Sequence, residues 1–200
     1  MSAAPSPRPR RGEGREALLR AVLRAVDKHG FAGLTYRAVA AEAGVTHGLV
    51  SYHFGSLEAM ISEALALAAD EAIRDSRMSV SSGEVSAFAD RVSTLVSEHP
   101  DAQTYQFELT FEARRRPELA SQVRALYENY YSVTERSLTE LGIERDEALT
   151  RLVFAALDGL VLQQLIFGDA GATDASIERL HELLATLAKS SRREPMAGGS

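Results

Sequence analysis

The sequence predicts an all-helical protein of about nine helices. Ala, Leu, Glu and Arg, which favour helices, dominate the long central segments, and Pro and Gly are scarce there. Apolar residues recur at helical spacing, as when Leu18, Val22 and Val26 fall at i, i+4 and i+8. Capping residues and glycines separate these segments. We therefore expect helices joined by short turns.

The periodic pattern also places the individual helices. They are expected over residues 15–29, 35–43, 46–53, 56–77, 84–98, 101–115, 117–141, 146–167 and 174–189. Thr35, Thr46 and Ser56 are the expected N-caps of three of them, and Gly44 supplies a tight turn. Residues 105–111 alternate apolar and polar side chains as a strand would, but no second segment alternates comparably, so a helix is predicted there too.

The composition restricts the class of protein. The 200-residue chain is 45% hydrophobic, which is enough to form a core. The absence of cysteine excludes disulfides, thiolate metal sites and a Cys nucleophile, and it fits a reducing cytoplasm. No apolar run of about 18 residues predicts a membrane-spanning helix. The Pro- and Arg-rich N-terminus does not have the pattern of a signal peptide.

Nothing in the sequence indicates an enzyme. The five histidines are scattered, and no H-x-x-x-H, P-loop or nucleophile-elbow motif occurs. Glu108 and Glu112 lie at i, i+4 and could serve acid–base chemistry or bind a metal, but no histidine accompanies them. We therefore expect no catalytic residues, no metal site and no cofactor.

The charge is unevenly distributed along the chain. The net charge is −6, yet residues 1–60 contain eight Lys and Arg against five Asp and Glu, a local charge of +3. The remainder therefore carries −9. A basic head on an acidic body can still bind a polyanion, because phosphate contacts depend on the local field more than on the total charge.

Two short helices over 35–43 and 46–53 meet at Gly44, with the small residues Ala40 and Ala43 where they would cross. This pattern is typical of a helix-turn-helix, whose second helix can enter the major groove of DNA. Three packed helices without a nucleic-acid partner would show the same pattern, so the spacing alone leaves both interpretations open.

Residues 30–60 read GFAGLTYRAVAAEAGVTHGLVSYHFGSLEAM. This sequence resembles the DNA-binding head of the TetR family of bacterial transcriptional regulators. The resemblance implies a cytoplasmic homodimer that binds a palindromic operator in double-stranded DNA, with no membrane partner. It also implies a repressor that a small-molecule effector releases. The implied organisation is a disordered basic arm (1–14), a helix-turn-helix domain (15–56), a ligand-binding and dimerisation domain (57–190) and a disordered tail (191–200).

The resemblance places the DNA contacts at the start of the second helix and along the third. The expected residues are Thr35, Tyr36, Arg37, Thr46, His47, Gly48, Leu49, Ser51, Tyr52 and His53. Thr46 would cap the third helix and, with the free N–H groups there, bind a phosphate. His47 would reach a base edge. Gly48 would allow close approach to DNA or pack against the preceding helix, and Leu49 would touch a thymine methyl or belong to the core.

The chain departs from the family pattern at two positions. Ser51 stands where members often carry Tyr, and Leu57 stands where they usually carry a phosphate-contacting Lys. Arg8, Arg10 and Arg11 of the arm either compensate by contacting DNA or form a solvated tail. These departures keep open a second interpretation, a ligand-sequestering or protein-interaction module that has lost DNA binding.

The body supplies candidates for a ligand pocket and a dimer interface. The candidate pocket residues are Tyr105, Glu108, Phe111, Tyr127, Tyr130, Tyr131, Phe154 and Gln163. Aromatic residues at helical spacing more often belong to a closed core than to a pocket, but the resemblance favours a pocket in this domain. The last two helices are expected to pair with their symmetry mates in a four-helix interface through Phe154, Asp158, Val161, Leu165, Leu180, Leu184 and Leu187.

Overall fold

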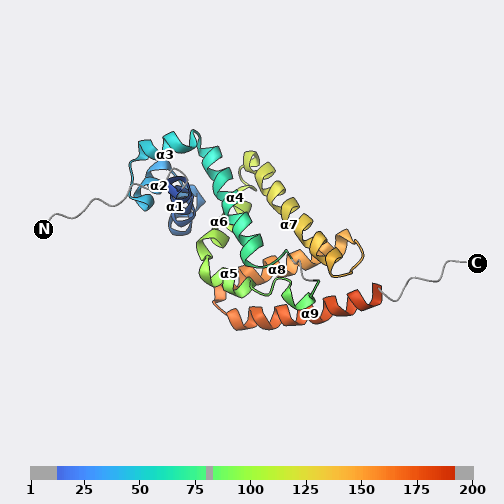
Figure 1. Ribbon diagram of the computed structural model, residues 1–200. Helices are drawn as coiled ribbons and strands as arrows, with labels where there is room; N and C mark the ends of the chain where they lie inside the picture. The colour runs from blue at the N-terminus through green and yellow to red at the C-terminus, as the bar shows by residue number, and fades with distance from the viewer. Residues whose placement is uncertain (1–12, 80–82, 192–200) are drawn as a thin grey trace, which may run out of the picture.

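A computed structural model describes residues 13–79 and 83–191, and every regular element in these ranges is helical. The α-helices in these ranges (Figure 1) are α1 (Glu13–His29), α2 (Tyr36–Ala43), α3 (His47–Phe54), α4 (Leu57–Asp75), α5 (Val92–Glu98), α6 (Pro100–Glu112), α7 (Ala120–Glu140), α8 (Glu147–Phe167) and α9 (Ala170–Ser191). Single 3-10 turns lie at η1 (Phe31–Gly33), η2 (Val85–Ala87) and η3 (Pro117–Leu119). The predicted all-helical class is confirmed.

Helices α1, α2 and α3 form an N-terminal head at one end of the molecule (Figure 1). The predicted apolar stripe of α1 is buried there, with Leu18, Val22 and Val26 almost completely inaccessible. Val39 of α2 and Val50 of α3 are fully buried as well. Burial of these side chains fixes how the three helices pack, because helices as short as α2 and α3 are not stable alone in water.

The turn between α2 and α3 depends on one glycine. Gly44 adopts a left-handed conformation (φ 67°), which ends α2 and redirects the chain. At the other end of α2, the Thr35 hydroxyl oxygen accepts a hydrogen bond from the Ala38 N–H at 3.1 Å, as predicted for an N-cap. Ala40 is buried and Ala43 is half-buried where α2 packs against α3. The predicted helix-turn-helix geometry is present.

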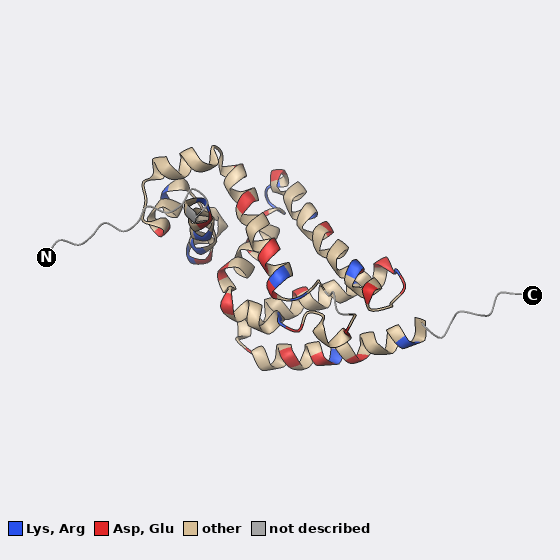
Figure 2. Ribbon diagram, in the orientation of Figure 1, with Lys and Arg blue, Asp and Glu red and all other residues tan. Residues whose placement is uncertain are grey.

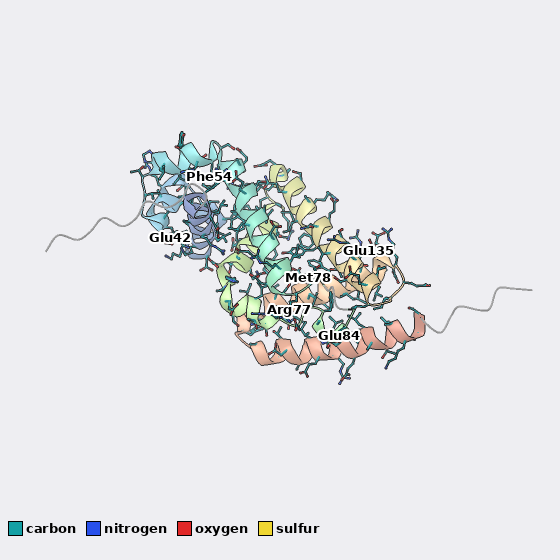
Figure 3. The ribbon with its side chains drawn as sticks, in the orientation of Figure 1. Glu42, Phe54, Arg77, Met78, Glu84 and Glu135 are labelled. Carbon is teal, nitrogen blue, oxygen red and sulfur yellow. The ribbon has the colours of Figure 1, made fainter. Side chains whose placement is uncertain are left out.

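Helix α4 connects the head to the body. The Ser56 hydroxyl oxygen accepts from the Ala59 N–H at 3.0 Å and caps the helix as predicted. From there α4 runs past α1 into the body, where it packs against α5, α6 and α7 (Figure 1). Just beyond its end lies the buried Met78, labelled in Figure 3. A displacement of α4 in the body would therefore be transmitted to the head.

The structure corrects two predicted boundaries in the body. The helix expected over 84–98 is divided into η2 and the short α5. Ala89 interrupts it with φ 56° and donates its N–H to the Arg77 carbonyl at 3.0 Å. The last helix begins at Ala170 instead of residue 174, because the Asp169 carboxylate accepts the Ala172 N–H at 2.9 Å and caps it.

The ends of the chain differ slightly from the expected arm and tail. Helix α1 begins at Glu13, so the last two residues of the expected arm are helical, and α9 extends to Ser191. The rest of the predicted arm (1–12) and tail (192–200) lies outside the described residues.

The unusual sequence patterns of α6 and α8 are explained by how these helices pack in the tertiary structure. Residues 105–111 are helical within α6 despite their strand-like alternation, and Tyr105 and Leu109 are fully buried. Helix α8 is long and apolar enough to cross a membrane, by length and composition alone. In the body, Val153 and Leu157 on one side of α8 are buried, whereas Leu152 on another side is exposed. Its apolar sequence thus serves both the core and a surface.

Candidate functional site

The outer face of α3 is exposed. Thr46, His47, Gly48 and Leu49 at its start are all accessible, and Leu49 is 41% exposed, so it does not belong to the core. One turn further on, Tyr52 is 84% exposed. A surface tyrosine this exposed gains little from folding, so this face is available to a partner.

Gly48 lies on this accessible face. A Cβ placed there would meet no atom within 4 Å, so close packing against α2 does not require glycine at this position. The absent side chain instead lets another molecule approach the backbone of α3. Of the two roles considered for Gly48, the structure excludes tight packing.

The start of α3 differs from the expected cap. Thr46 occupies the N-cap position, but its hydroxyl makes no capping hydrogen bond, so that prediction is wrong. The backbone of Thr46 is extended (φ −81°, ψ 147°), as is usual at an N-cap, and its carbonyl accepts from the Leu49 and Val50 N–H groups. The hydroxyl and the first N–H groups of α3 are left for an external acceptor such as a phosphate.

Ser51 and His53 are less available than the residues before them. Both are half-buried, and the Ser51 hydroxyl donates to the Gly48 carbonyl at 3.1 Å. The His53 ring lies edge-on to the Tyr52 ring at 5.8 Å, and the His53 carbonyl accepts from the Arg15 guanidinium at 2.7 Å.

At the start of α2, Thr35 and Arg37 are exposed, whereas Tyr36 is half-buried against the core. The ten predicted contact residues therefore divide into an accessible group (Thr35, Arg37, Thr46, His47, Gly48, Leu49 and Tyr52) and a half-buried group (Tyr36, Ser51 and His53).

The cations of the head are mostly engaged in ion pairs. Helix α3 carries no charged side chain, as its uniform colour in Figure 2 shows. Arg15 pairs with Glu63, Arg20 with Glu71, and both Arg24 and Lys28 with Glu42. Among the described residues no carboxylate pairs with Arg37. The basic field expected from the sequence is thus weaker at the head than the residue count implies, because formal charge does not reveal pairing.

The body encloses a cavity between α4, α5, α6, α7 and α8. Its lining residues are Ala72, Ser76, Met78, Val92, Leu95, Gln103, Gln106, Phe107, Thr110, Leu126, Tyr127, Tyr130, Phe154, Asp158 and Val161. The centre of a water molecule can reach about 50 Å³ inside it. A single water needs about 10–15 Å³ by this measure, so the cavity accommodates several waters or one compact ligand.

Three of the eight predicted pocket residues line this cavity, namely Tyr127, Tyr130 and Phe154. Their rings contact one another, with centroids 5.7 Å apart for Tyr127–Phe154 and 5.0 Å apart for Tyr130–Phe154. The Tyr130 hydroxyl donates to the Gln106 side-chain oxygen at 2.5 Å. Burial raises the pKa of both tyrosines, that of Tyr127 to about 12.

The other five predicted pocket residues lie elsewhere. Tyr105 is in the core and donates to the Ile61 carbonyl at 2.8 Å, and Glu108 faces the head. Phe111 and Gln163 are exposed. Tyr131 lies outside the cavity, beneath the Arg151 guanidinium at 4.7 Å. The presence of an aromatic ring could not show which of these residues line the cavity, because neighbouring residues of one helix point in different directions.

Several residues of the cavity were absent from the predicted set. Gln103, Gln106, Phe107 and Thr110 follow one another at i, i+3, i+4 and i+7, which places them on one face of α6. This helical spacing could have identified these residues as one face of a pocket from the sequence. Asp158, which was predicted at the dimer interface, lines this cavity.

Asp158 is the charged residue of the cavity. Burial raises the pKa of its carboxyl to about 6, although a hydrogen bond from Tyr127 lowers it. That bond is long, with 3.5 Å between the Tyr127 hydroxyl and Asp158 Oδ2. No basic side chain in residues 13–79 and 83–191 forms an ion pair with Asp158. The side-chain nitrogen of Gln103, also at the cavity, is buried and has no hydrogen-bond partner among the described residues.

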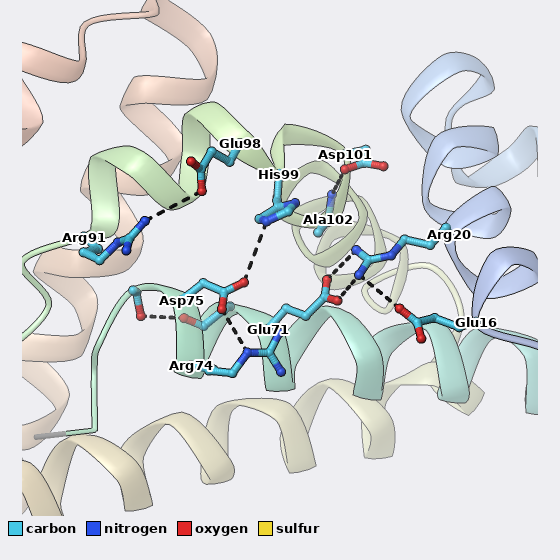
Figure 4. Close-up of polar contacts among 12 residues, drawn as sticks. Glu16, Arg20, Glu71, Arg74, Asp75, Arg91, Glu98, His99, Asp101 and Ala102 are labelled. Atoms are coloured by element: carbon cyan, nitrogen blue, oxygen red, sulfur yellow. Dashed lines mark hydrogen bonds and ion pairs between the residues drawn. The ribbon is translucent and has the colours of Figure 1, made fainter. Parts of the chain in front are cut away.

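Ion pairs and hydrogen bonds connect the head to this body. Glu71 of α4 is buried, with a side chain 4% exposed, and binds the Arg20 guanidinium of α1 through both carboxylate oxygens (Figure 4). Within the body, further along α4, Asp75 lies 3.7 Å from His99 Nε2 (Figure 4). On α6, a Glu108 carboxylate oxygen accepts from the Phe31 N–H at 3.4 Å. The head is therefore held by α4 and α6 together.

The predicted dimer residues are distributed differently from expectation. Phe154, Val161 and Leu184 are buried inside the protomer, which corrects their assignment to an interface, and Leu165 and Leu180 are half-buried. The exposed large apolar residues of α8 and α9 are Leu152, Ile166, Phe167, Leu183 and Leu187. The outward stripe is therefore rotated from the one expected, and of the predicted set only Leu187 belongs to it.

Comparisons with known proteins agree with this architecture. Residues 18–64 match the family model described as bacterial regulatory proteins, tetR family. Residues 83–190 match the model described as tetracyclin repressor-like, C-terminal domain. No curated protein sequence matches the chain.

Three solved structures illustrate the similarity. A member of the TetR family from Streptomyces coelicolor A3 is 27% identical over 84% of this chain and 98% of that chain, with a TM-score of 0.65. The multidrug binding protein EbrR, complexed with imidazole, is 28% identical over 90% and 97%, with a TM-score of 0.60. A transcriptional regulator from Rhodococcus sp. Rha1 is 22% identical over 88% and 96%, with a TM-score of 0.68.

Proposed function

Because this chain belongs to the TetR family of bacterial transcriptional regulators, we propose that it is a repressor that binds a palindromic operator as a homodimer and is released by a small-molecule effector. The observation that carries the proposal is the outer face of α3, which is exposed from Thr46 to Leu49 and is open at Gly48. A recognition helix needs such a face to enter the major groove.

Each accessible residue of the head has a role in this proposal. His47 and Leu49 reach base edges, the first by a hydrogen bond and the second by contact with a thymine methyl. The uncommitted hydroxyl of Thr46 and the free N–H groups beside it bind a phosphate. The Tyr52 hydroxyl donates a hydrogen bond to the sugar-phosphate backbone of the same DNA strand. Arg37, unpaired among the described residues, supplies the positive charge.

The dimer forms through the apolar faces of α8 and α9. Leu152, Ile166 and Phe167 of α8 and Leu183 and Leu187 of α9 are exposed, and Phe167 is 74% accessible. A Cβ placed on Gly159 would meet no atom within 4 Å, so this position allows a second helix to approach closely. The two α3 helices must then lie about 34–36 Å apart, or a multiple of this distance, to reach successive major grooves.

A pair of leucines tests this interface. Leu183→Ser should convert the dimer into a monomer in size-exclusion chromatography without loss of helicity. Leu184→Ser should instead unfold the protomer, because Leu184 is 1% exposed. A wild-type chain that is monomeric at about micromolar concentration would contradict the proposal.

Effector binding reaches the head through α4 and α6. Ala72 and Ser76 near the end of α4 line the cavity, and so does Gln106 of α6. On the side of α6 that faces the head, Glu108 binds the Phe31 backbone. A ligand that prefers one arrangement of these helices shifts the population toward one spacing of the two heads and so changes operator affinity.

A mobility-shift assay on the DNA that flanks the protein's own gene tests the function. We expect binding to a palindromic site that weakens as salt concentration rises. Selection of bound sites from random DNA would then define the operator. Failure to enrich any palindrome would contradict the proposal.

The half-buried Leu57 and the ion-paired cations of the head favour a second candidate, a ligand-sequestering module with weak or lost DNA binding. Tight ligand uptake without salt-sensitive DNA binding would support this alternative.

Deleting residues 1–11 tests the N-terminal arm, since Arg8, Arg10 and Arg11 lie outside the described residues. If the arm contacts DNA, the deletion lowers operator affinity and flattens its salt dependence, whereas unchanged values would show that the arm is not involved.

A further inference from the structure

We propose that the ligand of the body cavity is a compact organic cation, held between the Asp158 carboxylate and the rings of Tyr127, Tyr130 and Phe154. This inference rests on the proposed function, because it names the chemical class of the effector.

The first observation is a carboxylate without a cation. Asp158 lines the cavity, and the described lining residues include no Lys, Arg or His. Asp158 is half-buried, and its one hydrogen bond among the described residues comes from Tyr127 and spans 3.5 Å. Carboxylates removed from water are normally paired, because an isolated buried charge is costly. A cationic ligand would provide the missing partner, whereas an anion would meet a like charge and no compensating side chain.

The second observation is the ring cluster beside that carboxylate. Tyr127, Tyr130 and Phe154 line the same cavity and lie within 6 Å of one another in the two pairs that share Phe154. Aromatic faces attract organic ammonium groups through their negative quadrupole, and they provide the apolar surface that alkyl substituents need. A divalent metal ion is poorly matched to this lining, because Asp158 is the one carboxylate among the described lining residues and the other oxygens belong to neutral amide and hydroxyl groups.

The third observation is an unsatisfied amide. Gln103 lines the cavity, is 5% exposed, and has a side-chain nitrogen without a hydrogen-bond partner. A buried donor of this kind is normally satisfied by a water or a ligand. The cavity is therefore built for a polar occupant, and its accessible space of about 50 Å³ restricts that occupant to a compact one.

The experiment measures binding to the full-length protein without DNA, so that it does not depend on repressor activity. Isothermal titration calorimetry would compare tetramethylammonium, tetraethylammonium and phenyltrimethylammonium with tert-butylbenzene, which has the shape of phenyltrimethylammonium without its charge. At least one cation should bind saturably, and phenyltrimethylammonium should bind about tenfold or more tightly than its neutral counterpart.

Asp158→Asn should weaken cation binding about tenfold or more and leave tert-butylbenzene binding unchanged. Glu144→Gln, an exposed carboxylate in the loop before α8, is the matched control and should change neither. Equal binding of the charged and neutral probes, full cation affinity in Asp158→Asn, or no saturable cation binding at about 10 mM would each overturn the inference.

Mobility shifts distinguish this failure from failure of the proposed function. Operator release by neutral compounds but not by cations would overturn the cation assignment and leave the repressor proposal standing. Cation binding without any operator binding would overturn the repressor proposal and leave the cation assignment standing.

Discussion

Replacing Asp158 by Asn should stabilise the protein above pH 6. Burial raises the pKa of this carboxyl from 3.8 to about 6, so the folded protein binds its proton more tightly than the unfolded chain does. Stability is therefore gained as pH falls below about 6 and lost as pH rises through that value. At pH 8 the ionised carboxylate lowers the free energy of unfolding.

The size of the effect follows from the shift. Two pKa units correspond to about 3 kcal/mol at pH 8. An asparagine can still accept the Tyr127 hydrogen bond, but its buried amide nitrogen lacks a partner, which costs about 1 kcal/mol. The net gain is therefore about 2 kcal/mol, or roughly 4–8 °C in Tm for a chain of this size.

Thermal unfolding followed by circular dichroism would measure this gain at pH 8 and at pH 5. Protein concentration must be held constant, because the proposed dimerisation would also affect Tm. The gain should be about 2 kcal/mol at pH 8 and should fall to about 0.5 kcal/mol at pH 5, where Asp158 is protonated in the folded wild type but already ionised in the unfolded chain. Glu144→Gln should leave Tm unchanged at both values. The reasoning is refuted if Asp158→Asn is no more stable at pH 8, or if its advantage persists undiminished at pH 5.

Three further substitutions test separate parts of the structure. Gly48→Ala should stabilise α3 by about 0.5–1 kcal/mol, yet weaken operator binding about tenfold or more, because the new methyl faces the DNA; retained affinity would contradict the role of Gly48. Glu71→Gln should lower the free energy of unfolding in urea by about 1–3 kcal/mol, since it leaves Arg20 without its buried partner, whereas Glu16→Gln, 60% exposed, should change it by less than about 0.5 kcal/mol. Ser56→Ala should cost about 1 kcal/mol of stability through loss of a cap, but Thr46→Ala should cost almost nothing and instead reduce DNA binding; equal losses would show that both hydroxyls cap their helices.

The local sequence was sufficient to predict the helical class and the helix-turn-helix. Helical spacing places Leu18, Val22 and Val26 on one face whatever they pack against, and Gly44 ends α2 because it can adopt a left-handed conformation. Thr35 and Ser56 cap their helices through bonds to residues three positions away. These features depend on near neighbours in the chain, so the sequence alone determined them.

The position and chemistry of the cavity depended on the tertiary structure. Asp158 was assigned from the sequence to the dimer interface, and only the packing of α7 against α8 turns it toward Tyr127. Phe154 and Leu184 are as apolar as Leu152 and Leu183, yet the first pair is buried and the second is exposed. The rotation of a helix about its own axis is set by the helices around it, and periodicity does not encode that rotation when a helix is apolar on most sides. Ion pairing has the same origin, because Arg20 and Glu71 are far apart in the sequence and meet only where α1 crosses α4.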